Sequence, residues 1–253
     1  MNKDLLLAIC MFFSLYTYAE NHPNRIMLLV DMSSSMLTQD IKPDRLQSAK
    51  QLMKTFIKSH PTTPIGITAF AGEWENLSEP TLDHKYILSL LNKLELDSLQ
   101  YSDGTATGSA LICAASCLVN KQSNNAILLI TDGVTNCGNL STSTALDILK
   151  YYHIRLDVIA IGTNGKATYP YKVSKDSIQQ VTLDTQLDSK RISKMAKSTG
   201  GFYFEVTSLQ TFQNVLNKMK SPMPMKQSSN LPPSANFRMS KERIEWVIKK
   251  ITE

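Results

Sequence analysis

The feature that most constrains the fold is an apolar run near the start of the chain that ends abruptly in polar residues. Residues 25–30 have the length and composition of a strand that is buried on both faces, as in a parallel sheet. Asp31, Ser33 and Ser35 follow directly. Ligands of open α/β sheets bind beyond the carboxyl ends of the strands. We therefore expect these three side chains on one loop at the rim of a sheet.

The residue types on this loop favour a hard cation. One carboxylate and two hydroxyls, without Cys or His, suit Mg²⁺, Mn²⁺ or Ca²⁺ better than zinc. Two later segments add further oxygen atoms. Residues 103–108 form a short polar turn before an apolar helix, and residues 126–133 read as a second buried strand that ends in Thr131-Asp132-Gly133.

These three segments together resemble the metal-ion-dependent adhesion site of von Willebrand factor A domains. In that family the two serines and a threonine typically bind the metal directly, and the carboxylates often act through water. A carboxylate from the partner completes the coordination. The resemblance implies a divalent cation, Mg²⁺ first and Mn²⁺ or Ca²⁺ as alternatives. It implies these ligands: Asp31, Ser33, Ser35, Thr105 and Asp132.

The same resemblance implies a protein partner that offers an Asp or Glu carboxylate. Such a partner would contact the rim loops around Met36, Asp103 and Gly133. A run of the chain also resembles the bacterial Bat (Bacteroides aerotolerance) branch of the superfamily, through segments such as Asp40-Ile41-Lys42-Pro43-Asp44-Arg45-Leu46. That branch implies a link with other Bat proteins or with a MoxR-type AAA ATPase system, and a role in stress tolerance or envelope integrity.

The order of elements predicts an α/β fold. Strand-like runs alternate with amphipathic segments, which requires parallel strands, right-handed crossovers and helices on both faces of the sheet. This is the three-layer, Rossmann-like sandwich of von Willebrand A domains. Residues 72–77 are predicted to form an antiparallel edge strand, and residues 166–184 an inserted β-hairpin. Pro43 is expected in the first turn of a helix, and Asp157 at an exposed strand end.

The ends of the chain differ from its middle. Residues 1–19 are predicted to be a signal peptide or a short N-terminal membrane anchor, so the protein is expected to be exported, periplasmic or associated with the inner membrane. Residues 24–220 form the predicted domain and residues 221–239 a flexible linker. Residues 240–253 are predicted to form a short amphipathic helix that packs on its own domain, frays, or binds a partner or a membrane surface.

Charge and cysteine content exclude some function classes. The net charge of +5 is spread without interleaved aromatic residues, so no nucleic-acid partner is expected. Cys113 and Cys117 lie four residues apart on one helix face and are expected in the core. Cys137 lies in the loop after Asp132, where a pairing across the rim is an option in an oxidising compartment.

Two alternatives stay open beside the metal-dependent binding domain. One is an A domain that folds without metal and acts as a scaffold. The other is a Mg²⁺-dependent hydrolase on a similar α/β sheet. A haloacid-dehalogenase phosphatase needs a second carboxylate two residues after its first aspartate, where this chain has Ser33. A Rossmann dehydrogenase needs GxGxxG after the first strand, which is absent here. We therefore expect no catalytic residues and no enzymatic activity.

Overall fold

The computed structural model describes residues 24–95, 104–119, 124–133, 137–174 and 177–221, together with Trp246 and Lys249. The predicted leader lies outside the described residues. So do the predicted linker and C-terminal helix, apart from Ser221, Trp246 and Lys249. Within the described part of the chain, every helix is too short or too polar to cross a membrane.

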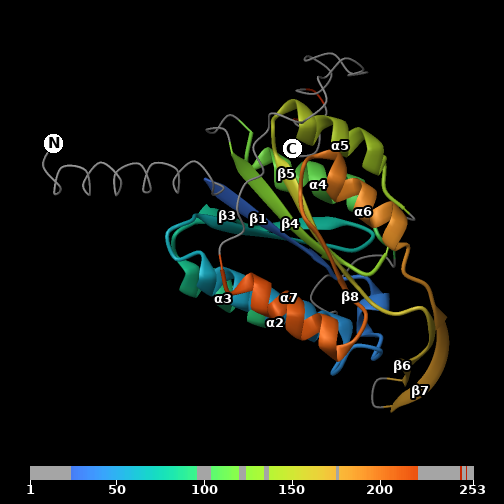
Figure 1. The fold of residues 1–253 in the computed structure, drawn as a ribbon. Coiled ribbons are helices and arrows are strands. Elements are labelled where there is room, and N and C mark those ends of the chain that lie inside the picture. The colour runs from blue at the N-terminus through green and yellow to red at the C-terminus, as the bar shows by residue number, and fades with distance from the viewer. Residues whose placement is uncertain are drawn as a thin grey trace, which may run out of the picture.

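The domain is built on a six-stranded sheet with β1 and β4 at its centre (Figure 1). The strand order is β3-β2-β1-β4-β5-β8, and only β3 runs antiparallel to its neighbour. The predicted antiparallel edge strand is therefore confirmed, although it extends further along the chain. The strands are β1 (Arg25–Asp31), β2 (Ile65–Phe70), β3 (Trp74–Thr81), β4 (Asn125–Thr131), β5 (Arg155–Ile161) and β8 (Tyr203–Val206).

Helices cover both faces of this sheet, which confirms the predicted three layers (Figure 1). One apolar core lies between the sheet and α2 (Arg45–Ser59), α3 (His84–Lys93) and α7 (Leu209–Met219). A second core lies between the opposite face and α4 (Thr107–Ser116), α5 (Thr142–Tyr151) and α6 (Ser189–Ser198). Because β1 is buried on both sides, its alternate side chains contribute to both cores.

Side-chain caps set the starts of the helices. Asp44, Asp83 and Asp188 each accept a hydrogen bond from the backbone N–H three residues later. The expectation that Pro43 lies in the first turn of a helix is wrong. The Asp44 carboxylate caps α2, which begins at Arg45, two residues after Pro43.

The expectation that Asp157 lies at an exposed strand end is also wrong. Asp157 is buried near the amino end of β5, where its Oδ2 accepts hydrogen bonds from Nε and Nη2 of Arg155 at 3.1 and 2.8 Å. Its Oδ1 accepts the backbone N–H of Phe202 at 2.9 Å. The buried carboxylate is tolerated because a buried arginine and a backbone donor surround it.

The predicted hairpin is present as a separate two-stranded sheet, β6 (Gly165–Ser174) and β7 (Ser177–Thr185). It leaves the domain beyond the carboxyl end of β5 (Figure 1). The backbone N–H of Gln39 donates to the carbonyl of Thr168 at 2.8 Å, which ties the hairpin to the loop that precedes α2. The hairpin carries these exposed large apolar side chains: Tyr171, Val173, Ile178 and Leu183.

Candidate metal centre

The candidate centre begins where the two central strands end side by side. β1 ends at Asp31, and β4 ends at Thr131 with Asp132 directly after it. The Thr131 hydroxyl donates to Oδ2 of Asp31, and the backbone N–H of Ser33 donates to Oδ1 at 2.9 Å. Asp31 is therefore fully buried and held from both sides by neutral donors.

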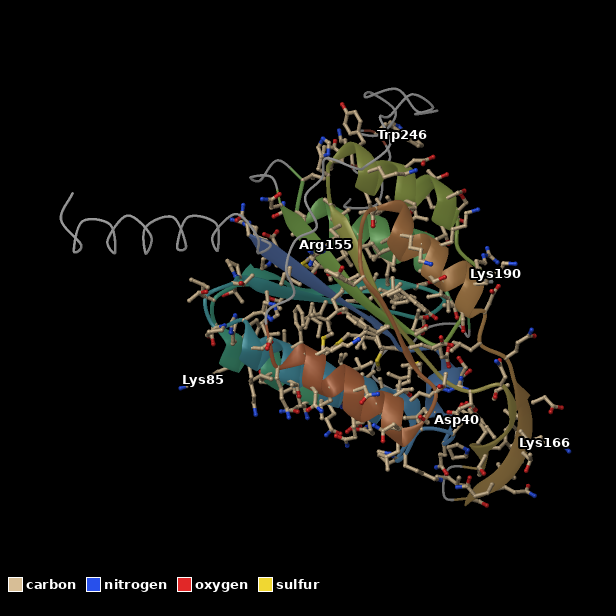
Figure 2. The ribbon with its side chains drawn as sticks, viewed as in Figure 1. Asp40, Lys85, Arg155, Lys166, Lys190 and Trp246 are labelled. Carbon is tan, nitrogen blue, oxygen red and sulfur yellow. The ribbon has the colours of Figure 1, made fainter. Side chains whose placement is uncertain are left out.

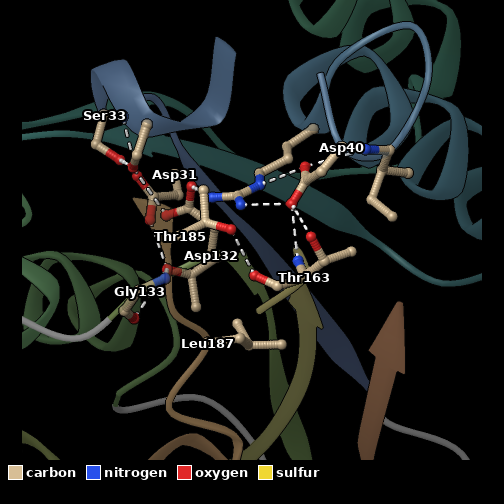
Figure 3. A network of polar contacts seen from close by, with 12 residues as sticks. Asp31, Ser33, Asp40, Asp132, Gly133, Thr163, Thr185 and Leu187 are labelled. Carbon is tan, nitrogen blue, oxygen red and sulfur yellow. Dashed lines mark hydrogen bonds and ion pairs between the residues drawn. The ribbon is translucent and has the colours of Figure 1, made fainter. Parts of the chain in front are cut away.

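A short 3₁₀ helix, η1 (Ser34–Leu37), turns the chain immediately after β1. This turn brings the hydroxyl oxygens of Ser33 and Ser35 to 3.1 Å from each other. Ser35 also donates to Oδ1 of Asp132 at 2.9 Å (Figure 3). The structure thus brings four of the five predicted ligands together through direct contacts: Asp31, Ser33, Ser35 and Asp132.

Thr105 lies at the same edge of the sheet, in the loop just before α4. Its side chain is buried, and the backbone N–H of the next residue, Ala106, donates to the carbonyl of Ala71 at 2.7 Å. Ala71 follows the last residue of β2, which pairs with Asp31 of β1. The place of Thr105 in the ligand set stays a prediction that this position supports.

The structure places the residues of the predicted partner-binding loops in different environments. Met36 is fully buried in the core, so its own side chain cannot contact a partner, whereas Ser35 beside it is exposed. Gly133 lies at the rim and its N–H is 3.2 Å from the Thr131 hydroxyl. Asp103 lies outside the described residues.

The electrostatics of Asp31 favour an added cation. Burial and the nearby negative charge of Asp132 raise the pKa of Asp31 from 3.8 to about 7. Among the described residues, no cationic side chain forms an ion pair with Asp31. A cation placed between the two carboxylates would remove the cost of ionising Asp31 there.

Sequence reasoning missed one residue of the site, Arg45 in the first turn of α2. Its guanidinium donates from Nη1 to Oδ2 of Asp132 at 2.6 Å, and from Nε and Nη2 to Asp40 at 2.9 and 2.6 Å. Only 5% of Arg45 is exposed. A signal was present in the sequence, because a cation in the first turn of a helix opposes the helix dipole and needs a carboxylate nearby.

The donor set fits a hard divalent cation in its chemistry. All of its atoms are carboxylate or hydroxyl oxygens, the ligands that Mg²⁺, Mn²⁺ and Ca²⁺ prefer. No group of three or more His, Cys, Asp or Glu side chains in the described ranges can hold a metal by itself. Binding would therefore depend on the hydroxyls of the η1 turn. The three described cysteines are thiols that form no disulfide across the rim in this structure.

Comparison with known proteins identifies the domain. Residues 26–134 match the family model described as the von Willebrand factor type A domain. Over residues 26–134 the chain is similar to von Willebrand factor A domains. This A domain resembles the Bat proteins: an aerotolerance-related membrane protein from Bacteroides fragilis is 26% identical, with a TM-score of 0.63 over 77% of this chain and 98% of that one.

Two further proteins are similar to this chain, one in structure and one in sequence. The structure of BatB from Bacteroides thetaiotaomicron shares the fold, with 23% identity and a TM-score of 0.65 over 77% of this chain and 98% of that chain. A UPF0353 protein from Mycolicibacterium paratuberculosis is 28% identical over 210 residues, which cover 78% of this chain and 60% of the relative. This chain thus spans about three fifths of that relative's length.

Proposed function

We propose that this A domain is a divalent-cation-dependent protein-binding domain of the bacterial cell envelope, without catalytic activity of its own. Mg²⁺ is the favoured cation, with Mn²⁺ or Ca²⁺ as alternatives. The partner is a protein that presents an Asp or Glu carboxylate. The observation that carries the proposal is the set of contacts that joins Ser33, Ser35 and Asp132 above the buried carboxylate of Asp31.

Charge balance at the rim supports a divalent cation. Asp31, Asp40 and Asp132 carry three negative charges when ionised, and Arg45 supplies one positive charge. The remaining formal charge of −2 equals the charge that one divalent cation neutralises. When bound, the cation supplies a positive centre to which a carboxylate from outside the chain is attracted. That attraction strengthens where the contact excludes water.

The chain's own oxygens would hold the cation at different depths. Ser35 is exposed, so its hydroxyl can face both a cation and an approaching partner, whereas Ser33 and Asp132 are buried behind it. Thr105 would contribute its hydroxyl from the loop before α4. Asp31 would contribute charge from beneath, while Thr131 and the backbone of Ser33 keep its carboxylate oriented.

The envelope assignment rests on the sequence and on the Bat likeness. The Bacteroides fragilis relative is described as an aerotolerance-related membrane protein. Residues 1–19 would act as a signal peptide or a short anchor, and the A domain would lie outside the cytoplasm. Other Bat proteins and a MoxR-type AAA ATPase system are the partners that this likeness favours, in stress tolerance or envelope integrity.

A capture experiment tests this function. The A domain is immobilised, and envelope extract is passed over it either in EDTA or in about 5 mM Mg²⁺, a concentration that fills a weak oxygen site. We expect a partner that binds in Mg²⁺ and is released by EDTA, and that Ser33→Ala and Asp132→Ala no longer retain. Ser34→Ala is the matched control in the same turn. Capture that survives both substitutions and EDTA would overturn the proposal.

A metal-free scaffold is the second candidate, because one observation favours it. Asp132 already has a cationic partner within the chain, since Arg45 lies 2.6 Å from its Oδ2. If that pair alone satisfies the rim, Mg²⁺ and Mn²⁺ will leave the melting temperature of the purified domain unchanged. A concentration-dependent rise in melting temperature with either metal would exclude the scaffold.

A further inference from the structure

The two oxygens of Asp132 contact different residues, one of which is Arg45. Oδ2 accepts the guanidinium Nη1 at 2.6 Å, and Oδ1 accepts the hydroxyl of Ser35 at 2.9 Å (Figure 3). Ser35 is the exposed hydroxyl of the η1 turn, so Oδ1 would be the oxygen of Asp132 available to a bound cation. The planar fork of the guanidinium fixes the direction of the carboxylate as well as its charge.

Arg45 is itself held firmly from behind. The carboxylate of Asp40 accepts hydrogen bonds from Nε and Nη2 of Arg45. Oδ2 of Asp40 also accepts hydrogen bonds from the backbone N–H and the hydroxyl of Thr163, at 2.8 and 2.9 Å (Figure 3). Gly162 closes the remaining side. A Cβ at that position would lie 2.9 Å from the guanidinium carbon, and its φ of +139° also favours glycine. The guanidinium therefore has no room to withdraw from Asp132 without moving the end of β5.

We propose that Arg45 is a positioning residue that keeps Oδ2 of Asp132 away from the cation and so preserves a coordination position for the partner's carboxylate. The inference rests on the proposed function and deepens it. If both oxygens of Asp132 turned toward the cation, the second negative charge would neutralise the metal within the chain. An external carboxylate would then gain less from binding.

Replacing Arg45 distinguishes a positioning role from a purely structural one, because the two roles predict changes of opposite sign in cation affinity. If Arg45 only supported the fold, replacing it would weaken cation binding and carboxylate binding together. If Arg45 restrains Asp132, its replacement frees a carboxylate oxygen and removes a positive charge from the rim. Both changes favour the cation and disfavour the external carboxylate, so the two affinities move in opposite directions.

The test uses Mn²⁺ as the cation and ¹³C-acetate as the carboxylate probe. Mn²⁺ affinity is measured by water-proton relaxation, and acetate binding by the paramagnetic relaxation of its carboxyl carbon in the Mn²⁺-loaded protein. For Arg45→Met we expect Mn²⁺ affinity equal to or above that of the wild type. Acetate affinity should fall by about tenfold or more, on the scale of one lost charge interaction.

Arg155→Met is the matched control. Arg155 is also a buried arginine, with 4% exposure, and it is ion-paired to Asp157 at 2.8 Å. Arg155 begins β5, whereas Asp40 accepts hydrogen bonds from Thr163, two residues beyond the end of that strand. Figure 2 shows Arg155 and Asp40 in different parts of the domain. The control should therefore lower stability and leave the ratio of acetate to Mn²⁺ affinity unchanged.

If Arg45→Met does not fold, Arg45→Lys is the second variant, because it keeps the charge without the fork. We expect Arg45→Lys to lose acetate affinity and to keep its Mn²⁺ affinity.

The outcomes separate the two proposals. A wild-type protein that binds no Mn²⁺ overturns the proposed function, and this inference with it. A wild-type protein that binds Mn²⁺, together with Arg45 variants that keep acetate affinity or lose both affinities in parallel, overturns the inference alone.

Discussion

The hydroxyl of Thr131 donates a 2.5 Å hydrogen bond to Oδ2 of Asp31, although the two residues are 100 positions apart in the chain. The bond joins the carboxyl ends of the two central strands of the sheet. It also decides which way the Asp31 carboxylate faces, because the other oxygen is held by the backbone N–H of Ser33. The rim is thus assembled by the pairing of β1 with β4.

The first prediction concerns that hydrogen bond. Thr131→Val keeps the shape of the side chain but leaves a buried carboxylate oxygen without its donor, which should lower the free energy of unfolding by about 1–3 kcal/mol. Thr131→Ser restores the hydroxyl and should recover most of the loss. Urea unfolding followed by circular dichroism measures both, and a Val variant as stable as the wild type would show that the bond contributes nothing.

The second prediction concerns acid stability. Burial alone would raise the pKa of Asp40, but the hydrogen bonds and charge of Arg45 outweigh it and hold the pKa below the ordinary 3.8. A depressed pKa stabilises the fold above the ordinary value, and this contribution is lost as the pH falls through the folded-state value.

Asp40→Asn should therefore be less stable than the wild type at pH 7, by about 1.5–3 kcal/mol for hydrogen bonds to a charged group. The difference should shrink in acid, because the carboxyl is protonated first in the unfolded wild type and then in the folded wild type. Urea midpoints at pH 7 and at about pH 3 provide the measurement. Asp147→Asn breaks a partly exposed ion pair with Lys150 and should cost under about 1 kcal/mol. A gap between wild type and Asp40→Asn that is equally wide at both pH values would refute the assignment.

The third prediction concerns two glycines. A Cβ at Gly201 would lie 1.9 Å from the carbonyl oxygen of Leu156, so Gly201→Ala must push β8 away from β5. Overpacking of this kind typically costs about 1–3 kcal/mol or more. Gly133→Ala is the control, because a Cβ there meets nothing within 4 Å. Thermal unfolding should separate the two variants clearly, and equal melting temperatures would contradict the close approach.

The fourth prediction concerns thiol chemistry. Burial and the neighbouring Cys117 raise the pKa of the Cys113 thiol to about 12, so Cys113 carries almost no thiolate at pH 8. Iodoacetamide should therefore label Cys137, which is only half-buried, well before Cys113 or Cys117 in the folded protein. Peptide mapping by mass spectrometry after a short pulse gives the order. Labelling of Cys113 as fast as that of Cys137 would contradict the burial of α4.

Much of the fold was predictable because its signals are local and repeated. Continuous apolar runs of strand length at residues 26–30 and 126–130 are typical of strands buried on both faces, and capping residues such as Asp83 and Ser208 mark helix starts. Asp157 shows where local signals fail. A charged residue in a strand reads as exposed unless its buried partner is known, and here that partner, Arg155, lies two residues away on the same strand.

Only those residues of the candidate site that belong to recognisable motifs were predictable from the sequence. Three short segments identify Asp31, Ser33, Ser35 and Asp132 because strand ends of a parallel sheet meet at one edge. Arg45 belongs to none of these segments. It reaches Asp132 across 87 positions, a distance that only the packing of α2 against the sheet closes. The local pattern indicates a carboxylate near Arg45 but does not say which one.

Cation-dependent binding requires that the η1 turn hold a divalent cation. Isothermal titration of the purified domain with Mg²⁺ and with Mn²⁺ tests this directly. We expect one saturable site in the wild type and in Ser34→Ala, and an affinity at least about tenfold lower in Ser33→Ala and Ser35→Ala, since even outer-sphere changes cost that much. A wild-type domain that gives no binding heat with either metal, or serine variants that bind as tightly as the wild type, would contradict it.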